Sequence, residues 1–329
     1  MVNRNAGIHT ADCVGYMRRM EEGVVDLVVT SPPYDDLRDY KGFDFDCESV
    51  AKGLARVVKE GGVVVWVVGD RINGGRTLTS FEHAFTFRDA GFTVYDAMIF
   101  KKRNTPFMRK RAYTNCYDFM FVFTKGNPAT FNPLRSPSVR SGLAPLPYLK
   151  GTDGVNRKVE RALSEHKVRT NIWSYAVGRN GTTADMYAFK HPAMFPENLA
   201  RDHILSWSNP GELVFDPMCG AGTTCKMAKV TGRRWLGVDV SREYTTIARK
   251  RVRASQEGTI ESLPSRADPF AEAVICRWCP NEIPEARQAA TGGRAVTCSH
   301  ECSVYNTRRR RCELKAADRA KQRQMAVAT

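Results

Sequence analysis

Two uninterrupted runs of β-branched and apolar residues constrain the fold of this chain more than any other feature. They are Val24–Thr30 (VVDLVVT), which stops before two prolines, and Val63–Val68 (VVVWVV), which follows two glycines. Runs without polar alternation are typical of parallel strands buried on both faces of a sheet. Between them, residues 47–60 carry apolar side chains at helical spacing, which predicts a crossover helix that ends at Gly61. The pattern is that of an α/β fold.

The alternation of strand-like and helix-like segments continues along the chain with one interruption. Residues 126–190 are rich in Pro, Gly, Ser and Arg and have weak periodicity, so we expect an irregular insertion there. The further strands that we expect are Phe92–Phe100, Tyr117–Thr124, Leu213–Asp216 and Trp235–Asp239. The first two of these are predicted to form a hairpin-like pair at a sheet edge, joined by a basic loop. Further helices are expected from Thr223 and over residues 242–253.

The charge of the chain is strongly positive and unevenly distributed. The 329 residues carry a net charge of +15, which favours a polyanionic partner such as nucleic acid. Residues 101–113, 135–190 and 303–329 each carry a net charge of +6, so the remainder of the chain carries −3. The positive charge therefore belongs to three segments and not to the body of the protein.

Secretion and membrane insertion are not expected. The N-terminal sequence lacks the apolar core of a signal peptide, and the longest apolar run is far shorter than the roughly 20 residues that span a bilayer. We therefore expect a cytoplasmic protein with no membrane partner. In that compartment the ten cysteines are expected to be reduced thiols, except where tight spacing indicates a metal site.

A glycine turn follows the fifth predicted strand, Leu213–Asp216. Residues 214–224 read VFDPMCGAGTT, which places a G-x-G turn between a strand and a helix. Small residues let a ligand approach the backbone, and the helix N-terminus offers free N–H groups. Asp239 follows at the end of the next strand, where a carboxylate can accept hydrogen bonds from ribose hydroxyls. The pattern predicts a nucleoside cofactor, with a purely structural tight turn as the alternative; it lacks the third glycine of the dinucleotide fingerprint.

A second motif, Thr30-Ser31-Pro32-Pro33-Tyr34, follows the first predicted strand. The prolines fix the backbone and remove two N–H donors, so the carbonyl groups of Ser31 and Pro32 are presented as rigid acceptors. Acceptors without competing donors suit an exocyclic amino group, and Tyr34 offers a face on which a base can stack. The alternative is a proline-terminated strand followed by a turn.

Together, TSPPY and FDPMCGAGTT resemble the catalytic and cofactor motifs of amino-group DNA methyltransferases, in the order of the permuted β group. The resemblance covers roughly residues 6–255. It implies a Rossmann-like class I methyltransferase sheet that binds S-adenosylmethionine and acts on a base flipped out of double-stranded DNA. It also implies that Asp216 lies near the amino-acid part of the cofactor, and that the protein is encoded by a prokaryote or a phage.

Weaker matches extend the resemblance. In the segment IHTADCVGYM it implies that Asp12 meets the cofactor adenine, and in HPAMFPE that Phe195 lines the cofactor pocket. Phe100-Lys101 matches an aromatic-lysine pair of the family, whereas Met218-Cys219 departs from its usual residues. The predicted catalytic residues are Ser31, Pro32, Pro33 and Tyr34. The predicted cofactor-binding residues are Asp12, Phe195, Asp216, Gly220, Gly222 and Asp239.

The predicted reaction is methyl transfer to the N4 amino group of cytosine. The methyl group is already activated in the cofactor, so the residues need only position the amino nitrogen and accept its hydrogen bonds. Methylation at cytosine C5 would need a Pro-Cys dipeptide, and the sequence contains none. Within the resemblance, serine at position 31 favours N4-cytosine over N6-adenine, which stays as the alternative. A catalytically inert DNA-binding zinc protein and a methyltransferase acting on RNA also stay open.

The C-terminal region carries a paired-cysteine pattern that predicts a structural zinc ion. Its ligands would be Cys276, Cys279, Cys298 and Cys302, in an arrangement that resembles small treble-clef fingers. Four unliganded thiols, or His300 in place of one cysteine, are the alternatives. The residues predicted to contact DNA phosphates are Lys101, Lys102, Arg103, Arg109, Lys110, Arg111, Arg308, Arg309, Arg310 and Arg311.

The motifs divide the chain into six segments. We expect the two halves of a methyltransferase domain at 1–126 and 191–255, a target-recognition region at 127–190, a linker at 256–270, a zinc finger at 271–312 and a basic tail at 313–329. A second copy of the chain, as a homodimer, and a cognate restriction endonuclease stay open as further partners.

Overall fold

The computed structural model describes residues 7–33, 45–73, 75–104, 111–137, 148–150, 154–158, 166–178, 181–257, 274–275 and 282–283. The chain divides into two compact units. The first comprises Met1–Arg135 and Val168–Leu263, and the second comprises Ser136–Lys167 and Pro264–Thr329. No helix in these described ranges is long and apolar enough to cross a membrane.

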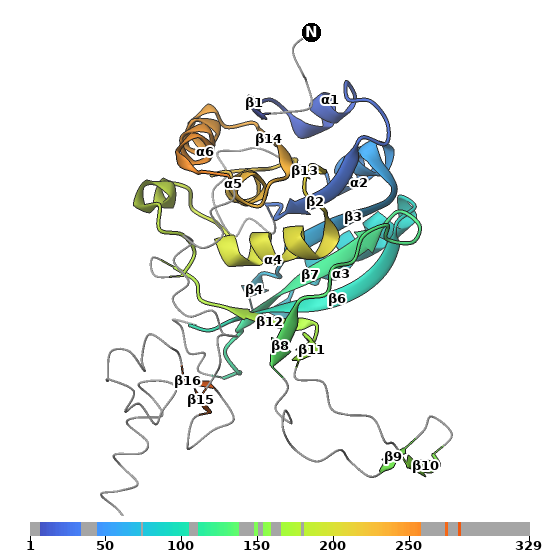
Figure 1. Ribbon diagram of the computed structural model, residues 1–329. Helices are drawn as coiled ribbons and strands as arrows, with labels where there is room; N and C mark the ends of the chain where they lie inside the picture. Colours follow the sequence, from blue (N-terminus) through green and yellow to red (C-terminus); the bar gives the residue numbers. More distant parts are fainter. Residues whose placement is uncertain are drawn as a thin grey trace, which may run out of the picture. The chain divides into compact units, whose positions relative to one another are not determined.

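The first unit is built on an eight-stranded sheet with the order β1-β14-β13-β2-β3-β7-β6-β12 (Figure 1). The strands are β1 (Gly7–Thr10), β2 (Val25–Thr30), β3 (Val58–Val68), β6 (Thr93–Lys102), β7 (Tyr117–Thr124), β12 (Ile172–Tyr175), β13 (Leu213–Asp216) and β14 (Arg234–Asp239). The five strands from β1 to β3 in this order are parallel. β7 is antiparallel to both of its neighbours, and β12 is parallel to β6. The expected α/β fold is confirmed.

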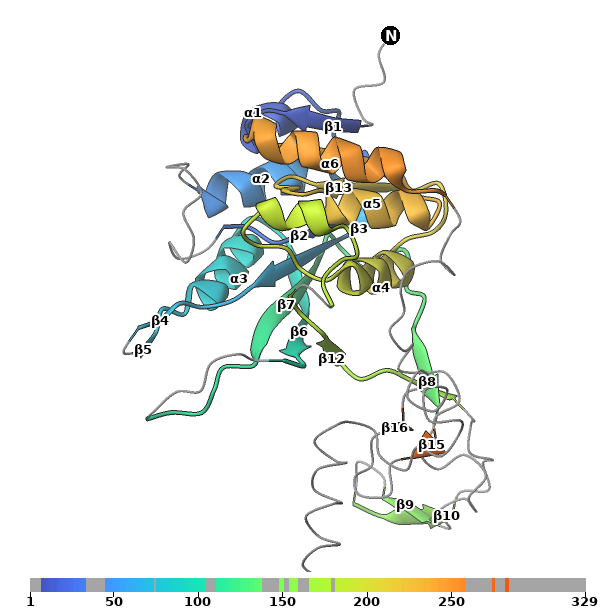
Figure 2. The ribbon, with the colours of Figure 1, turned by 90° about the vertical axis from the view of Figure 1, so that its left-hand side faces the viewer.

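Helices cover both faces of the sheet (Figure 2). They are α1 (Cys13–Met17), α2 (Cys47–Val57), α3 (Thr79–Asp89), α4 (Glu197–Trp207), α5 (Thr223–Val230) and α6 (Arg242–Ala254), with a 3-10 turn, η1, at Met186–Lys190. Val28 and Val64 pack under α1, α2 and α3, whereas their neighbours Leu27 and Val63 pack under α4 and α5. Successive side chains of a strand point to opposite faces, so both faces of β2 and β3 are buried, as their unbroken apolar runs predict.

The end of the crossover helix differs from the expectation. α2 ends at Val57, not at Gly61, because Val58 already pairs with Val25 as the first residue of β3. The next pair along the same two strands is Leu27 with Val63, so residues 59–62 form a bulge. Gly61 lies in this bulge at a φ of 77°, where its amide donates to the Lys125 carbonyl at 2.7 Å. Gly61 therefore allows the bulge in β3 and does not end the helix.

The predicted β6–β7 pair is present, but the prediction that it forms a sheet edge is wrong. β12 pairs along β6 and is itself the last strand on that side. Its side chains Trp173 and Tyr175 are buried, and the Tyr175 hydroxyl donates to Asp202 on α4 at 2.9 Å. Part of the segment expected to be an irregular insertion therefore completes the main sheet.

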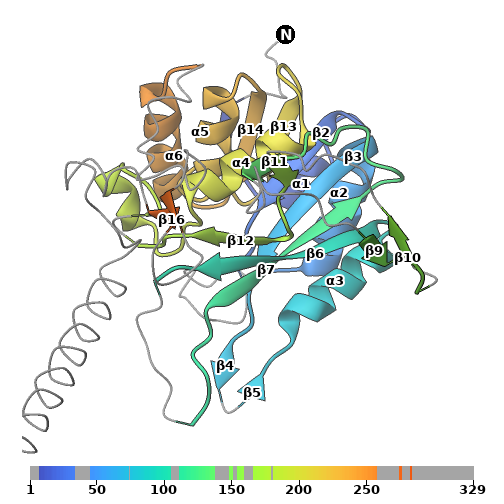
Figure 3. The same ribbon diagram turned by 60° about the horizontal axis from the view of Figure 1, so that its bottom comes forward.

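Short two-stranded pairs make up the remaining described strands. They are β4 (Ile72–Asn73) with β5 (Gly75–Arg76), β8 (Arg135–Pro137) with β11 (His166–Val168), β9 (Tyr148–Lys150) with β10 (Asn156–Lys158), and β15 (Val274–Ile275) with β16 (Glu282–Ile283). The β4–β5 hairpin follows β3 at its carboxyl end, where it leads into α3 (Figure 3).

Candidate active site

The two sequence motifs meet at the carboxyl ends of two neighbouring parallel strands. β13 pairs with β2 in the register Val214 to Leu27 and Phe215 to Val28. At the end of the strands, the Thr30 hydroxyl donates a hydrogen bond to Asp216 Oδ1 at 2.7 Å. Chain segments 186 residues apart are therefore joined at the carboxyl ends of the two strands.

Asp216 is buried at this junction, and its environment changes its acidity. Burial raises the pKa of the carboxyl group from 3.8 to about 7, although hydrogen bonds from Thr30 and the Met218 amide favour the ionised form. The carboxyl group therefore changes its charge near neutral pH and gains most from a cation placed beside it.

The glycine loop depends on backbone conformations that other residues rarely adopt. Gly220 and Gly222 have φ values of 48° and 78°. A Cβ atom on Gly220 would lie 2.6 Å from His191 Nε2, and one on Gly222 would lie 2.7 Å from the Ala248 Cβ. Gly222 is also the residue before the first turn of α5, and no side chain caps that turn. The loop is therefore closely packed from behind, and its helix N-terminus retains backbone donors.

Two further acids lie at the ends of the next two strands. Asp239, half-buried at the end of β14, accepts hydrogen bonds from the Gly220 and Ser241 amides, both at 2.8 Å. Burial raises its pKa, while these two amides favour the ionised form. Asp12 follows β1, is exposed, and caps α1 through a hydrogen bond from the Gly15 amide at 2.6 Å. Because Thr10 pairs with Asp239 in the sheet, the structure brings both acids to the same edge.

The remaining predicted residues near the motifs are only partly described. Ser31 and Pro33 are half-buried and Pro32 is buried, directly after β2, whereas Tyr34 lies outside the described residues. Phe195 is half-buried, just before α4, and packs against the apolar core on that side of the sheet. The structure thus brings Ser31 and Asp216 to one region.

The predicted DNA-contacting residues differ in their surroundings. Lys102 is already paired with Asp118 of β7 at 2.7 Å. Lys101, Arg103 and Arg111 are exposed. The others lie outside the described residues: Arg109, Lys110, Arg308, Arg309, Arg310 and Arg311.

The zinc prediction also falls outside the part of the chain that the structure describes. All four predicted ligands lie there: Cys276, Cys279, Cys298 and Cys302. Within the described residues, no group of three or more His, Cys, Asp or Glu side chains is placed to hold a metal ion.

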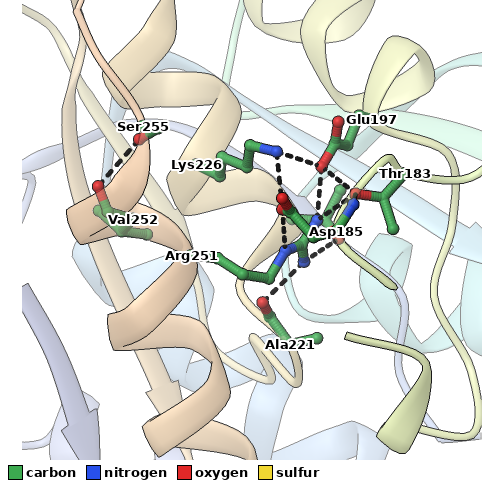
Figure 4. Close-up of polar contacts among 9 residues, drawn as sticks. Thr183, Asp185, Glu197, Ala221, Lys226, Arg251, Val252 and Ser255 are labelled. Atoms are coloured by element: carbon green, nitrogen blue, oxygen red, sulfur yellow. Dashed lines mark hydrogen bonds and ion pairs between the residues drawn. The ribbon is translucent and has the colours of Figure 1, made fainter. Parts of the chain in front are cut away.

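Sequence reasoning missed a cluster of buried and half-buried charges behind the glycine loop (Figure 4). Lys226 and Arg251 form ion pairs with Asp185 and Glu197 at distances of 2.6–2.9 Å. A signal for Arg251 is present in α6, because it shares a helix face with the buried residues Tyr244 and Ala248 at i−7 and i−3.

Fold and site together define an α/β protein with a candidate ligand site at the carboxyl edge of its sheet, where two motifs from opposite ends of the domain converge. The chain matches the DNA methylase family (N6_N4_Mtase) over residues 25–250. It is 46% identical over 235 residues to the orphan methyltransferase M.BamHII of Bacillus amyloliquefaciens, a match that covers 70% of this chain and 89% of the relative. The chain therefore belongs to the N4/N6 amino-methyltransferase family and is a DNA methyltransferase of that class.

One more distant relative and one solved structure are also similar to the chain. The DNA adenine methyltransferase YhdJ of Escherichia coli (strain K12) is 25% identical over 268 residues, covering 77% of this chain and 84% of that protein. The solved structure of the PvuII DNA methyltransferase (cytosine-N4-specific) superposes with a TM-score of 0.56 at 20% identity, over 75% of this chain and 86% of the other. The superposition shows that the two proteins share the methyltransferase fold.

Proposed function

We propose that the chain transfers a methyl group from S-adenosylmethionine to the exocyclic N4 amino group of a cytosine flipped out of duplex DNA. The observation that carries this proposal is the 2.7 Å hydrogen bond between Thr30 and Asp216, which joins the segment carrying Ser31 to the strand that leads into the glycine loop. Methyl transfer needs such an adjacency, because the amino nitrogen has to approach the methyl group in line with the bond that breaks.

The donor set at the sheet edge fits S-adenosylmethionine. We assign the ribose hydroxyls to Asp239 and the adenine amino group to Asp12, since carboxylates accept hydrogen bonds from both. Asp216 is assigned to the cofactor's amino-acid part, where a positive ammonium group would favour its ionised form. Phe195 supplies an aromatic wall, and the first turn of α5, which no side chain caps, offers backbone N–H groups to the ligand. When bound, the cofactor supplies an activated sulfonium methyl group.

Ser31 and the carbonyl group of Pro32 are assigned to the target amino group. By accepting its hydrogen bonds they draw the nitrogen lone pair out of conjugation with the ring, which strengthens a weak nucleophile. Pro32 and Pro33 offer no N–H donor that would compete for the same acceptors. Tyr34 is assigned as the stacking surface for the flipped base.

Three substitutions separate the two halves of this assignment. Ser31→Ala and Tyr34→Ala are expected to lose turnover while cofactor affinity, measured by calorimetry, is largely kept. Asp239→Ala is expected to lose cofactor affinity, because the ribose contact is removed. Normal turnover by Tyr34→Ala would overturn the assignment of the catalytic segment.

The choice of cytosine over adenine rests on Ser31, and the family contains enzymes of both kinds. N6-adenine is therefore the second candidate. The decisive experiment is to incubate plasmid DNA with the protein and labelled cofactor, digest it, and identify the modified nucleoside by mass spectrometry. N4-methylcytosine supports the proposal, N6-methyladenine establishes the alternative, and no transfer to DNA refutes both. A parallel reaction with RNA tests the remaining acceptor.

We also propose that the C-terminal segment is a zinc finger that contributes to DNA affinity. Supporting it, β15 pairs antiparallel with β16, and Cys276 and Cys279 lie between these two strands in the sequence. Elemental analysis of the purified protein should find one zinc per chain, lost with the thiolate ligands. Changing the four arginines of 308–311 to alanine should weaken DNA binding and flatten its salt dependence, whereas an unchanged slope would contradict the phosphate contacts.

A further inference from the structure

The guanidinium group of Arg251 is fully buried and uses all five of its N–H donors (Figure 4). Nε donates to Asp185 at 2.9 Å, and Nη2 donates to Glu197 at 2.6 Å and to Thr183 at 3.3 Å. Nη1 donates to the Ala221 carbonyl at 2.7 Å and to the Thr223 hydroxyl at 3.1 Å. One side chain of α6 therefore contacts two separate segments of the chain.

The charges around Arg251 balance within the cluster. Lys226 of α5 donates to Asp185 Oδ2 and to Glu197 Oε1, both at 2.8 Å, so each acid contacts both bases. Thr183 donates to the same Glu197 oxygen at 2.6 Å. A buried charge that is paired in this way is held in one orientation, because any movement leaves a charged group without its partners.

The Ala221 carbonyl that Arg251 binds belongs to the glycine loop. Ala221 lies between Gly220 and Gly222, and Thr223 is the first residue of α5. An apolar side chain could fill the space that Arg251 occupies and would avoid the cost of burying a charge. An apolar side chain could not hold the Ala221 carbonyl on the side of the loop that faces away from the ligand. It would therefore also fail to fix the orientation of the N–H groups of the loop.

We propose that Arg251 is a positioning residue for the glycine loop, and that Asp185 and Glu197 orient its guanidinium group for this role. The inference deepens the proposed function and rests on it only for the identity of the ligand, S-adenosylmethionine. Arg251 acts through the loop and touches neither the cofactor nor the target base. The proposal adds Thr183, Asp185 and Glu197 to the residues that support cofactor binding.

The test compares two substitutions at Arg251 with a matched control. Arg233 is another buried arginine that donates to backbone carbonyls, those of Thr231 and Ser208, at the opposite end of β14 from the loop. Arg251→Met is expected to weaken cofactor binding about tenfold or more, because the loop loses a charged hydrogen bond. Arg233→Met is expected to lower the melting temperature while the Kd for S-adenosylmethionine stays within about twofold. Equal Kd changes in both variants would overturn the proposal.

Arg251→Lys separates geometry from charge. A lysine keeps the positive charge between the two acids, but its single ammonium group cannot also hold the Ala221 carbonyl in the same fork. Its cofactor affinity is therefore expected to fall as it does in Arg251→Met. Wild-type affinity in Arg251→Lys would show that charge alone suffices and would overturn the positioning role.

Two further measurements keep the proposal testable if a variant folds poorly or the ligand is wrong. Thr183→Val removes one neutral partner of Glu197 and Arg251, so it should weaken cofactor binding about threefold and also lower the free energy of unfolding. Amide hydrogen exchange of residues 218–226 in the cofactor-free protein should be faster in Arg251→Lys and unchanged in Arg233→Met. Unchanged exchange in Arg251→Lys would refute the positioning role, whereas a wild-type protein that binds no S-adenosylmethionine would refute the proposed function alone.

Discussion

The buried carboxyl group of Asp216 should make the stability of the protein fall as pH rises toward neutrality. Burial raises its folded pKa from 3.8 to about 7, so between these values the folded state binds a proton that the unfolded state has released. At about 1.4 kcal/mol per pKa unit, the free energy of unfolding loses about 4 kcal/mol from this group between pH 4 and 8. The stabilisation is fully present below pH 3.8 and is lost through pH 7.

Asp216→Asn isolates this contribution, because asparagine is neutral throughout and close in shape. Unfolding by urea at a series of pH values gives the free energy of unfolding for both proteins, and subtracting one from the other cancels the groups that titrate independently of Asp216. The free energy of unfolding of the wild type minus that of the variant should decline by about 4 kcal/mol from pH 4 to pH 8. Parallel pH profiles would refute the argument that burial dominates the acidity of Asp216.

The same group should couple cofactor binding to proton release. If Asp216 lies beside the cofactor ammonium group, binding favours its ionised form and expels a proton from the free protein at about pH 6. Titration calorimetry in two buffers with different ionisation enthalpies measures this release. We expect the wild type to release about one proton per bound cofactor at pH 6 and almost none at pH 8. Asp216→Asn should release none. Absence of release from the wild type at pH 6 would place the ammonium group elsewhere.

Two further substitutions test the packing around the site. Gly222→Ala should unfold more easily and bind cofactor weakly, since its new Cβ would lie 2.7 Å from the methyl group of Ala248 on α6. Gly211→Ala is the control, because Gly211 has a similar φ but open space around it. Its free energy of unfolding in urea should fall only by the backbone cost of about 1–2 kcal/mol. Asp202→Asn should lower the free energy of unfolding by about 3–5 kcal/mol, because Asp202 holds Arg169 at 2.8 Å and the hydroxyl of Tyr175 on β12. A loss under about 1 kcal/mol would show that this buried pair does not anchor β12.

The sequence predicts those parts of the fold whose residues are chemically uniform. β2 and β3 were predictable because every side chain of an inner parallel strand meets an apolar layer, and α6 because its apolar residues recur at helical spacing. β12 was not predictable in the same way. It contributes four residues at the end of the sheet, only two of which are buried, and its anchor is the hydrogen bond from Tyr175 to Asp202 on a different element.

Charged residues are harder to predict, because their role depends on partners that come from elsewhere in the chain. Lys102 belongs to a basic segment and was interpreted as a DNA contact, yet it pairs with Asp118 across two antiparallel strands. The pairing depends on the register of β6 and β7, which the sequence of the connecting loop does not fix. The net charge of a segment is therefore an upper limit on the charge that it can offer to a phosphate backbone.

The candidate site divides into residues that we propose to face a ligand and residues that hold them in place. The first kind has a sequence signature, because glycines at a turn and an acid at a strand end are required wherever such a ligand is bound. The second kind has none: Arg251 faces the interior as its helical spacing indicates, but Asp185, Glu197 and Ala221 reach it only because three segments meet behind the loop. A glycine loop without side chains cannot fix its own conformation, so the groups that fix it have to come from its neighbours in the fold.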